Sequence, residues 1–399
     1  MDSDTVSEVV GSNAQQLGAL FGLKNPVEGE ALYRRIIDAL GVSESIKFAT
    51  VTGLSLLPSG ADSRAIIKVD GDFPFVIKVG AARIVENERR FLDHAGAAFP
   101  RILGHGSYGN DRWYAMEAGE PTSTERLVFS DLIKGTLAGT WFETVRDMTA
   151  DLKEMMASSV IEHRCNVADY HYTKRIRSIF GRKDFLEFAE KCLGSRDNVS
   201  RVIHQGIRLN GEQLRGASNY DDDISRFLRE FPSTKSSKIH GDFHLKNVLR
   251  RQGGGRFLLI DPRLQWDDQP IDKFGFSDPI YDMSTMLHSV AAMTQILANI
   301  DAQRSDEICV VSINNGAIEL DLKIDVSTSI EAFLSRADEL VPPKCLTWGW
   351  EVRLLTGAAN ALFGWLKYEN AIKTQTAWAA VYGIAVLFLK EAAKRAEAR

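Results

Sequence analysis

The stretch Ile239-His-Gly-Asp-Phe-His-Leu-Lys-Asn247, followed by Asp261 at the end of a short apolar run, decides the fold of this chain. Between Asn247 and Asp261 lie two short runs that begin with apolar residues, Val248-Leu-Arg250 and Phe257-Leu-Leu-Ile260, and the stretch between them contains three consecutive glycines. Apolar runs on either side of a glycine turn predict a β-hairpin. The sequence therefore predicts a polar loop and, across one hairpin, a second carboxylate on the same platform.

This platform carries the groups that phosphoryl transfer requires. A carboxylate must align the attacking hydroxyl and accept its proton, and oxygen ligands must hold the magnesium ion that neutralises a polyphosphate. Asp242 would be the base, with Asn247 and Asp261 as metal ligands. A lone Asp in a loop is more often a turn cap, but the full pattern H-G-D-x-x-x-x-N followed by I-D favours catalysis. His244 could approach the transferred phosphate or pack within the loop.

The segment 239–247 is similar to the catalytic loop of the aminoglycoside phosphotransferase and choline kinase superfamily, relatives of the protein kinases. Ile260-Asp-Pro-Arg263 stands where those kinases carry D-F-G, and Asp278-Pro-Ile-Tyr-Asp-Met283 resembles the element that begins a helix and braces the loop. The resemblance implies a mainly structural role for Asp278 and Asp282, with Asp282 bonded to the catalytic loop. It also implies ATP or GTP with Mg²⁺ in a cleft between two lobes, and a small-molecule hydroxyl as acceptor.

The N-terminal half offers a lysine and a glutamate in the order that a kinase-like fold requires. Lys78 lies inside the apolar run 75–79, which follows an Asp-Gly turn and reads as a strand. An ammonium in an apolar strand needs a partner, unless the strand is an edge and the lysine points to water. The helix predicted over 81–94 contains Glu86 and Glu88, and the resemblance favours Glu88. Such a pair aligns the α- and β-phosphates.

Two further segments match the positions of nucleotide contacts in the same superfamily. Leu57-Pro-Ser-Gly-Ala-Asp-Ser63 takes the place of the loop over the phosphates, although it holds a single glycine. Backbone N–H groups and a hydroxyl there could bind phosphate, from Ser59, Gly60 and Ser63. Trp113-Tyr-Ala-Met-Glu117 takes the place of the hinge, where the backbone of Met116 and Glu117 would contact the purine. Main-chain contacts do not separate ATP from GTP.

The pattern along the chain predicts an α+β protein, and the resemblance implies a two-lobed, protein-kinase-like organisation for it. Residues 1–44 form a partly helical N-terminal extension, most simply a cap on the first lobe. Residues 45–118 form a small antiparallel, five-stranded nucleotide-binding lobe with one helix. Residues 119–399 form a larger, mainly helical lobe that is catalytic and binds the acceptor. A hairpin is predicted in it between Ile308 and Ile324, around Asn314-Asn-Gly316.

Three features bear on the acceptor, and the third disagrees with the other two. Arg263 would repel a polycation, and the segment 170–177 mixes aromatic and basic residues, as sites for anionic sugars do. The candidate contacts are His171, Lys174, Arg175, His244 and Arg263. The same segment also reads as a solvated helix face, and acidic residues at 267, 268 and 272 favour a cationic acceptor.

Composition excludes several classes of protein. A net charge of −5 argues against wholesale nucleic-acid binding. The four cysteines are far apart, which suits buried or free thiols in a reducing compartment better than disulfides or a zinc site. The start carries no basic-then-apolar leader, and the longest apolar run, 378–389, is shorter than the ~20 residues that cross a bilayer. We therefore expect a cytoplasmic protein without membrane or nucleic-acid partners; the sequence leaves its oligomeric state open.

Three rival interpretations share these residues. An atypical protein kinase would have the same machinery, but no A-P-E-like segment follows Asp261. An aminoglycoside-modifying phosphotransferase is distinguished by drug-dependent turnover of ATP. A binding module that has lost catalysis is disfavoured because each expected polar group is present.

Overall fold

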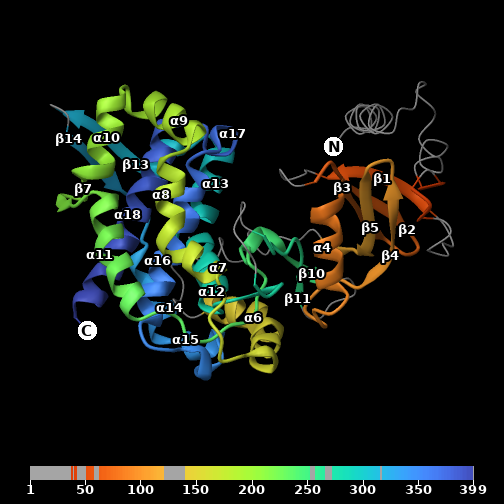
Figure 1. Cartoon of the computed structure of the whole chain (residues 1–399). Coiled ribbons are helices and arrows are strands. Elements are labelled where there is room, and N and C mark those ends of the chain that lie inside the picture. The colour runs from red at the N-terminus through yellow and green to blue at the C-terminus, as the bar shows by residue number, and fades with distance from the viewer. Residues whose placement is uncertain are drawn as a thin grey trace. The chain divides into compact units, whose positions relative to one another are not determined.

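The computed structural model describes residues 37–38, 40–42, 51–57, 63–120, 140–251, 257–265, 272–314 and 317–398. The chain divides into two compact units. Unit 1 comprises Met1–Pro121 and Leu249–Asp261, and unit 2 comprises Thr122–Val248 and Pro262–Arg399. Unit 1 is built on an antiparallel sheet and unit 2 is mainly helical, so the predicted α+β class is confirmed (Figure 1).

Unit 1 contains a five-stranded sheet in the order β1-β2-β3-β5-β4, with one helix between β3 and β4. All neighbouring strands pair antiparallel. The elements are β1 (Val51–Leu57), β2 (Ala65–Gly71), β3 (Phe75–Ala81), α4 (Ala82–Leu92), β4 (Ile102–Tyr108) and β5 (Asp111–Glu117). This is the sheet and helix that the alternation of short apolar runs predicts.

The two faces of β3 have different neighbours because side chains alternate along a strand. Phe75, Ile77 and Val79 are buried in an apolar cluster that also contains residues 37, 40 and 42. These N-terminal residues therefore pack on the sheet, as expected of a cap; the rest of 1–44 lies outside the described residues. Lys78 points to the opposite face, toward α4, whose buried residues include Val85 and Glu88 one turn apart.

A second, three-stranded sheet completes unit 1. Its order is β11-β10-β6, formed by β11 (Phe257–Leu259), β10 (Val248–Arg251) and β6 (Gly119–Glu120). A Cβ on Gly119 would lie 2.7 Å from the Cβ of Leu249, so only glycine allows this approach. The backbone N–H of Leu259 donates to Ala98 O at 2.8 Å. The hairpin that leads to Asp261 thus belongs to unit 1, whereas the sequence placed it with the helical lobe.

Helices dominate unit 2, and α18 lies at its centre among α11, α16 and β13 (Figure 1). Its helices are α6 (Thr140–Ser159), α7 (Val167–Asp169), α8 (Arg175–Phe180), α9 (Lys183–Leu193), α10 (Arg196–His204), α11 (Ala217–Glu230), α12 (Ile280–His288), α13 (Thr294–Asp301), α14 (Ser327–Ser335), α15 (Ala337–Leu340), α16 (Trp350–Trp365), α17 (Glu369–Ile372) and α18 (Gln375–Glu397). Among the described residues of unit 2, π-helical segments at Tyr170–Lys174 and Ser289–Met293 and 3₁₀ turns at Leu245–Asn247, Ser305–Glu307 and Pro343–Cys345 accompany these helices.

Helix α18 is apolar along most of its length. By length and composition alone it could cross a membrane, and 78% of its most apolar window is buried inside the fold. Its partners within unit 2 explain the apolar run: it packs on α16 and α11 as a core helix. Gly357 of α16 permits similarly close packing on α12, because a Cβ there would lie 2.4 Å from Ser284 Oγ.

A four-stranded sheet in unit 2 was only half predicted. Strands β13 (Cys309–Asn314) and β14 (Ala317–Leu322) form the expected hairpin. A second hairpin, β7 (Ile207–Leu209) and β8 (Glu212–Leu214), joins it through a parallel pairing of β14 with β7. The missed signal is the turn Asn210-Gly211, whose residues have φ of 50° and 82°, values that Asn and Gly adopt most readily. The short strands β9 (Ser237–Lys238) and β12 (Phe276–Ser277) pair separately.

Candidate active site

In unit 1 the side chain of Lys78 joins two carboxylates. Its Nζ lies 2.8 Å from Glu88 Oε1 and 2.5 Å from Asp261 Oδ1. Lys78 is 3% exposed and Glu88 6% exposed, whereas the side chain of Asp261 is 49% exposed. The pair expected between Lys78 and Glu88 is therefore present, and Glu86 instead binds Arg89 on the helix surface. One end of the network is enclosed and the other is open to solvent.

The protein holds the Lys78 ammonium in its charged form. Burial alone would lower the pKa of Lys78, but the carboxylates of Asp261 and Glu88 outweigh it and raise the pKa above its ordinary value. Tyr114 donates from its hydroxyl to Glu88 Oε2 at 3.0 Å. This residue pairs with Lys78 across β3 and β5, so the two share a face. The sequence did not identify Tyr114, because that inference needs the strand register.

Asp261 has an unusual backbone conformation. Its φ is +58°, in the left-handed region. Aspartate tolerates this region better than most side chains, and such conformations concentrate at functional sites. The turn directs Oδ1 to Lys78, and half of the side chain faces solvent. A carboxylate oxygen with that exposure fits a hard cation such as Mg²⁺.

In unit 2 the loop that contains Asp242 is hydrogen-bonded to Asp282 of α12. The two oxygens of the Asp282 carboxylate each accept a backbone N–H, from His240 and Gly241, both at 2.7 Å. This agrees with the structural role expected of Asp282. Asp278 forms a fully buried ion pair with Arg353 at 2.7 Å, which anchors the start of the same helix. Gly241 has a φ of +82°, which favours glycine at that turn.

The loop brings Asp242, His244 and Asn247 together. His244 Nε2 lies 3.6 Å from Asp242 Oδ2. The amide nitrogen of Asn247 donates to the carbonyl of Asp242 at 2.9 Å, so its amide oxygen points away from that bond and can bind a cation. Burial would raise the pKa of Asp242, but His244, Arg263 and His240 together hold it below its ordinary value. Asp242 is thus ionised at neutral pH and accepts hydrogen bonds.

Asp282→Asn should reveal how the loop is held. Burial raises the pKa of Asp282 to about 7, against the ordinary 3.8, although the two N–H donors oppose it. Between about pH 4 and 7 the folded state therefore keeps a proton on Asp282 that the unfolded state has released. The free energy of unfolding falls as the pH rises through this range. The asparagine variant should be less stable by roughly 1–3 kcal/mol at pH 5, since its NH₂ group meets a backbone N–H.

The difference in stability between wild type and this variant should narrow toward pH 7. Urea denaturation at a series of pH values measures it. A difference that widens with pH would contradict the raised pKa of Asp282.

The remaining nucleotide contacts predicted from sequence have mixed outcomes. Ser59 and Gly60 lie outside the described residues. Ser63 is half-buried just before β2, and Met116 is buried near the end of β5. The carboxylate of Glu117 forms an ion pair with Arg251 at 2.8 Å, and the backbone N–H of Glu117 donates to Arg101 O. The N–H of Glu117 is therefore already used within unit 1, so the predicted contact of Glu117 with a purine would have to come from its carbonyl group.

The candidate acceptor residues of unit 2 occupy different environments. His171 is fully buried, and its ring stacks on Tyr281 with centroids 3.6 Å apart. We therefore correct its expected role from direct contact with the acceptor to support of Tyr281. Lys174 is exposed. Arg175 donates to the Tyr281 hydroxyl, and Arg263 donates its backbone N–H to His240 O at 2.9 Å.

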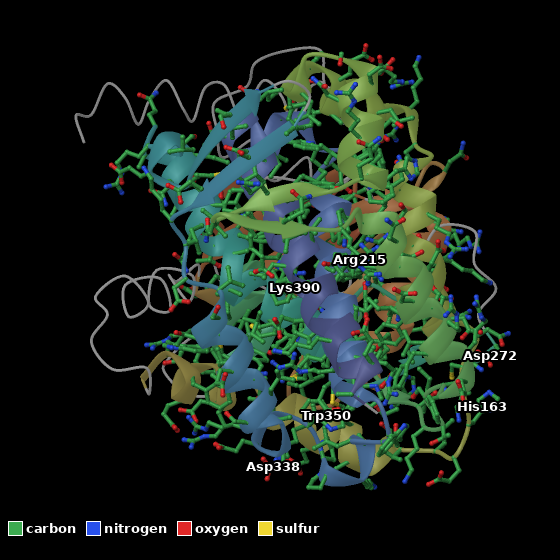
Figure 2. All side chains as sticks on the ribbon, turned by 90° about the vertical axis from the view of Figure 1, so that its left-hand side faces the viewer. His163, Arg215, Asp272, Asp338, Trp350 and Lys390 are labelled. Atoms are coloured by element: carbon green, nitrogen blue, oxygen red, sulfur yellow. The ribbon has the colours of Figure 1, made fainter. Side chains whose placement is uncertain are left out.

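Oxygen ligands for magnesium are present in both units. Asn247 in unit 2 and Asp261 in unit 1 offer an amide and a carboxylate oxygen, the hard donors that this ion prefers. Elsewhere in unit 2, ligand atoms of His163, Cys165 and Asp272 lie within 4.8 Å of one another. His163 and Asp272 already bind each other at 2.9 Å (Figure 2), and burial raises the pKa of the Cys165 thiol. This group is therefore explained as a contact between segments.

Comparisons with known proteins give only distant similarities. No protein-family model matches the chain, and no curated protein matches it. Among solved structures, it is similar to a thermostable mutant of aminoglycoside phosphotransferase APH(4)-Ia in a ternary complex with AMP-PNP and hygromycin B, with 14% identity, a TM-score of 0.45, and coverage of 90% of this chain and 97% of that one. It is also similar to a protein assigned as a fructosamine-3-kinase from Haemophilus somnus 129PT, with 10% identity, a TM-score of 0.43 and the same coverage.

Proposed function

We propose that this chain is a magnesium-dependent phosphotransferase that moves the γ-phosphate of ATP or GTP to a hydroxyl of a small molecule, such as a sugar or a sugar-like metabolite. One observation carries the proposal. The buried ammonium of Lys78 is held between Glu88 and a solvent-facing carboxylate, Asp261. A buried structural ion pair needs one acid for one base, whereas an aligned lysine beside an exposed acid suits a metal-bound polyphosphate.

Each unit contributes different groups to the reaction. In unit 1, Lys78 would bind phosphate oxygens and Glu88 would keep its ammonium in place. For Mg²⁺, Asp261 of unit 1 would supply a carboxylate oxygen, and Asn247 of unit 2 would supply an amide oxygen. When bound, the ion neutralises charge on the phosphate oxygens and orients them. Phosphoryl transfer involves little covalent chemistry by the protein, so positioning and charge dominate the rate.

Asp242 would act on the acceptor. Its carboxylate is ionised at neutral pH and half-buried, so it can accept a hydrogen bond from the attacking hydroxyl and align it. As the acceptor oxygen bonds to the γ-phosphorus, the bond from that phosphorus to the β,γ-bridging oxygen breaks. The hydroxyl proton passes to Asp242, and the nucleoside diphosphate leaves with the bridging oxygen. Asp282 would keep Asp242 in place through the backbone of 240–241.

Lys78→Met tests the nucleotide-binding role. We expect transfer to fall about 10²-fold or more, since the ion pair must be in place for the phosphates to align. Removing one partner of a buried pair also costs about 3–5 kcal/mol of stability, because Glu88 then keeps only Tyr114 as a donor among the described residues. Turnover and calorimetric binding of Mg-ATP and Mg-GTP are measured at a temperature where circular dichroism shows native helix content.

Lys68→Met is the matched control, because Lys68 lies on the neighbouring strand β2 and pairs with Asp70 near the surface. It should leave nucleotide binding and transfer unchanged. If wild type binds neither nucleotide in the presence of magnesium, or if Lys78→Met turns over like wild type, the proposed function is wrong.

The acceptor can be found by an unbiased search. The enzyme is incubated with γ-labelled ATP and a fractionated metabolite extract, and the labelled compound is identified. Label on an aminoglycoside alone, or on a protein, would replace the small-metabolite proposal by one of its rivals. The four unpaired, buried cysteines support a reducing compartment such as the cytoplasm.

A further inference from the structure

Arg175 is a half-buried cation of unit 2 without an acidic partner among the described residues. Its Nη1 donates to the neutral hydroxyl of Tyr281, and its Nη2 packs on Gly364, where an added Cβ would lie 3.0 Å away. Arg177, two residues later, contrasts with it: that guanidinium binds Asp221 at 2.9 Å and Asp222 at 2.7 Å. One arginine of this basic segment is neutralised by the fold and the other is not.

A π-helical segment directly before Arg175 fixes the local geometry. Residues 170–174 form this segment, and such irregular turns are frequent at functional sites. The carbonyl of His171 accepts a hydrogen bond from the buried amide of Asn360. The His171 ring stacks on Tyr281 with an interplanar angle of 9°. Tyr281, which receives the Arg175 hydrogen bond, is therefore held on one face by a fully buried ring.

The first connection from Arg175 to Asp242 runs through α12. Tyr281 precedes Asp282, whose carboxylate binds the backbone N–H of Gly241 at 2.7 Å. Gly241 in turn precedes Asp242. Arg175 is thus bonded to the residue before Asp282, and the proposed base, Asp242, follows the residue that Asp282 binds.

A second connection runs along the other side through aromatic rings. Gly364, on which Arg175 packs, precedes Trp365, whose Nε1 donates to His288 Nε2 at 3.3 Å. The His288 ring meets the His244 ring edge-on at 6.4 Å. His244 Nε2 lies 3.6 Å from Asp242 Oδ2. Arg175 and Asp242 therefore belong to one closed circuit of contacts within unit 2.

Electrostatics agrees with this placement. Burial, with the charges of His244 and Arg175, lowers the pKa of His288 to about 3, although Asp242 opposes the shift. Arg175 and Asp242 are therefore both close enough to His288 to act on it, and Arg263 is close enough to act on Asp242.

We infer that the acceptor carries an oxyanion, a phosphate or a carboxylate, in addition to the hydroxyl that is phosphorylated, and that Arg175, oriented by the buried Tyr281, binds it. This inference rests on the proposed function for its meaning. The planar guanidinium matches an oxyanion with two donors, and its hydrogen bond to the buried Tyr281 hydroxyl holds it in one orientation. A polycationic acceptor would be repelled at the same place. The basic segment that the sequence left open between substrate contact and solvated face thus serves both purposes.

Inorganic phosphate is the first probe, with acetate as the carboxylate arm. Binding to the full chain is measured by calorimetry in the presence of saturating Mg-ADP, so that the nucleotide site is filled. We expect Arg175→Met to weaken oxyanion binding about 10- to 100-fold, the usual loss for a charged hydrogen bond. Arg175→Lys, which keeps the charge but loses the fork, should restore part of it.

Arg182→Met is the matched control, because Arg182 is an exposed arginine of the same unit that pairs with Asp184. It should bind phosphate like wild type. Absence of binding by either oxyanion, or equal binding by wild type and Arg175→Met, would overturn the inference. The phosphate and acetate arms show which oxyanion the site prefers.

A second experiment separates the inference from the proposed function. The metabolite extract is split by ion exchange into anionic, neutral and cationic pools before incubation with labelled ATP. Label in the anionic pool, lost with Arg175→Met, is the expected result. Label confined to the neutral or cationic pool would contradict the inference that the acceptor carries an oxyanion. It would still agree with the proposed phosphotransferase function. Failure of nucleotide binding would contradict the proposed phosphotransferase function. The phosphate titration would still show whether Arg175 binds an oxyanion.

Discussion

Asp242→Asn is expected to lower phosphoryl transfer by about 10²–10⁴-fold, the usual contribution of a general base. The asparagine has the same shape, and its amide can still meet the acceptor, but it cannot take the hydroxyl proton. The Asp242 carboxylate lies 3.6 Å from His244. This distance is longer than a normal hydrogen bond, so the substitution breaks no short hydrogen bond to His244. Folding and nucleotide binding should therefore persist. Steady-state turnover with the identified acceptor measures the effect.

Asp222→Asn is the control for Asp242→Asn. Asp222 is an exposed acid of unit 2 that pairs with Arg177, and its loss should leave turnover unchanged. The base assignment is refuted if purified Asp242→Asn turns over at the wild-type rate.

The second large effect is expected at Asp261. Asp261→Asn should lower transfer about 10³-fold, since a lost metal ligand forfeits several kcal/mol of charge stabilisation. Asparagine suits the test better than alanine because it tolerates the φ of +58° found there. The variant also removes one of the two carboxylates that hold Lys78. We expect the magnesium concentration for half-maximal rate to rise, and a titration of rate against magnesium measures it.

Asp261→Ala should inactivate the protein as well, with a further loss of stability from strain in the left-handed region. Asp70→Asn, on the surface of the same unit beside Lys68, is the control and should behave as wild type. Unchanged magnesium dependence in Asp261→Asn would show that this carboxylate does not bind the metal.

Local chemistry explains why part of the site could be predicted from sequence. A lysine in an apolar strand must find a partner, and a helix with acidic residues followed directly. The pair of Lys78 with Glu88 follows from burial and chain order, with the resemblance choosing between the two glutamates. The contact of Asp282 with the loop 239–247 was predicted from the resemblance of the segment 278–283, and the two N–H bonds at 2.7 Å agree with it.

Features that depend on register or on long-range pairing could not be predicted. Tyr114 joins Glu88 only because β5 pairs with β3 in one particular register, and a shift by one residue would turn it to the other face. The parallel pairing of β7 with β14 links segments far apart in the chain. Periodicity also does not show that Arg177 has acidic partners and Arg175 has none among the described residues, because those acids come from α11, a separate segment of the chain.

Unit 1 is discontinuous in the chain, and this affects how it is made. Its last strands and Asp261 come from Leu249–Asp261, after the whole of 122–248. At about 5–20 residues per second, a ribosome needs many seconds between completing Pro121 and supplying β10. During that interval nascent β6 lacks its strand partner, and the Lys78 ammonium has Glu88 but lacks Asp261. A gene fragment that stops at Pro121 would preserve that unfinished state, so a complete unit 1 cannot be produced by truncation at that point.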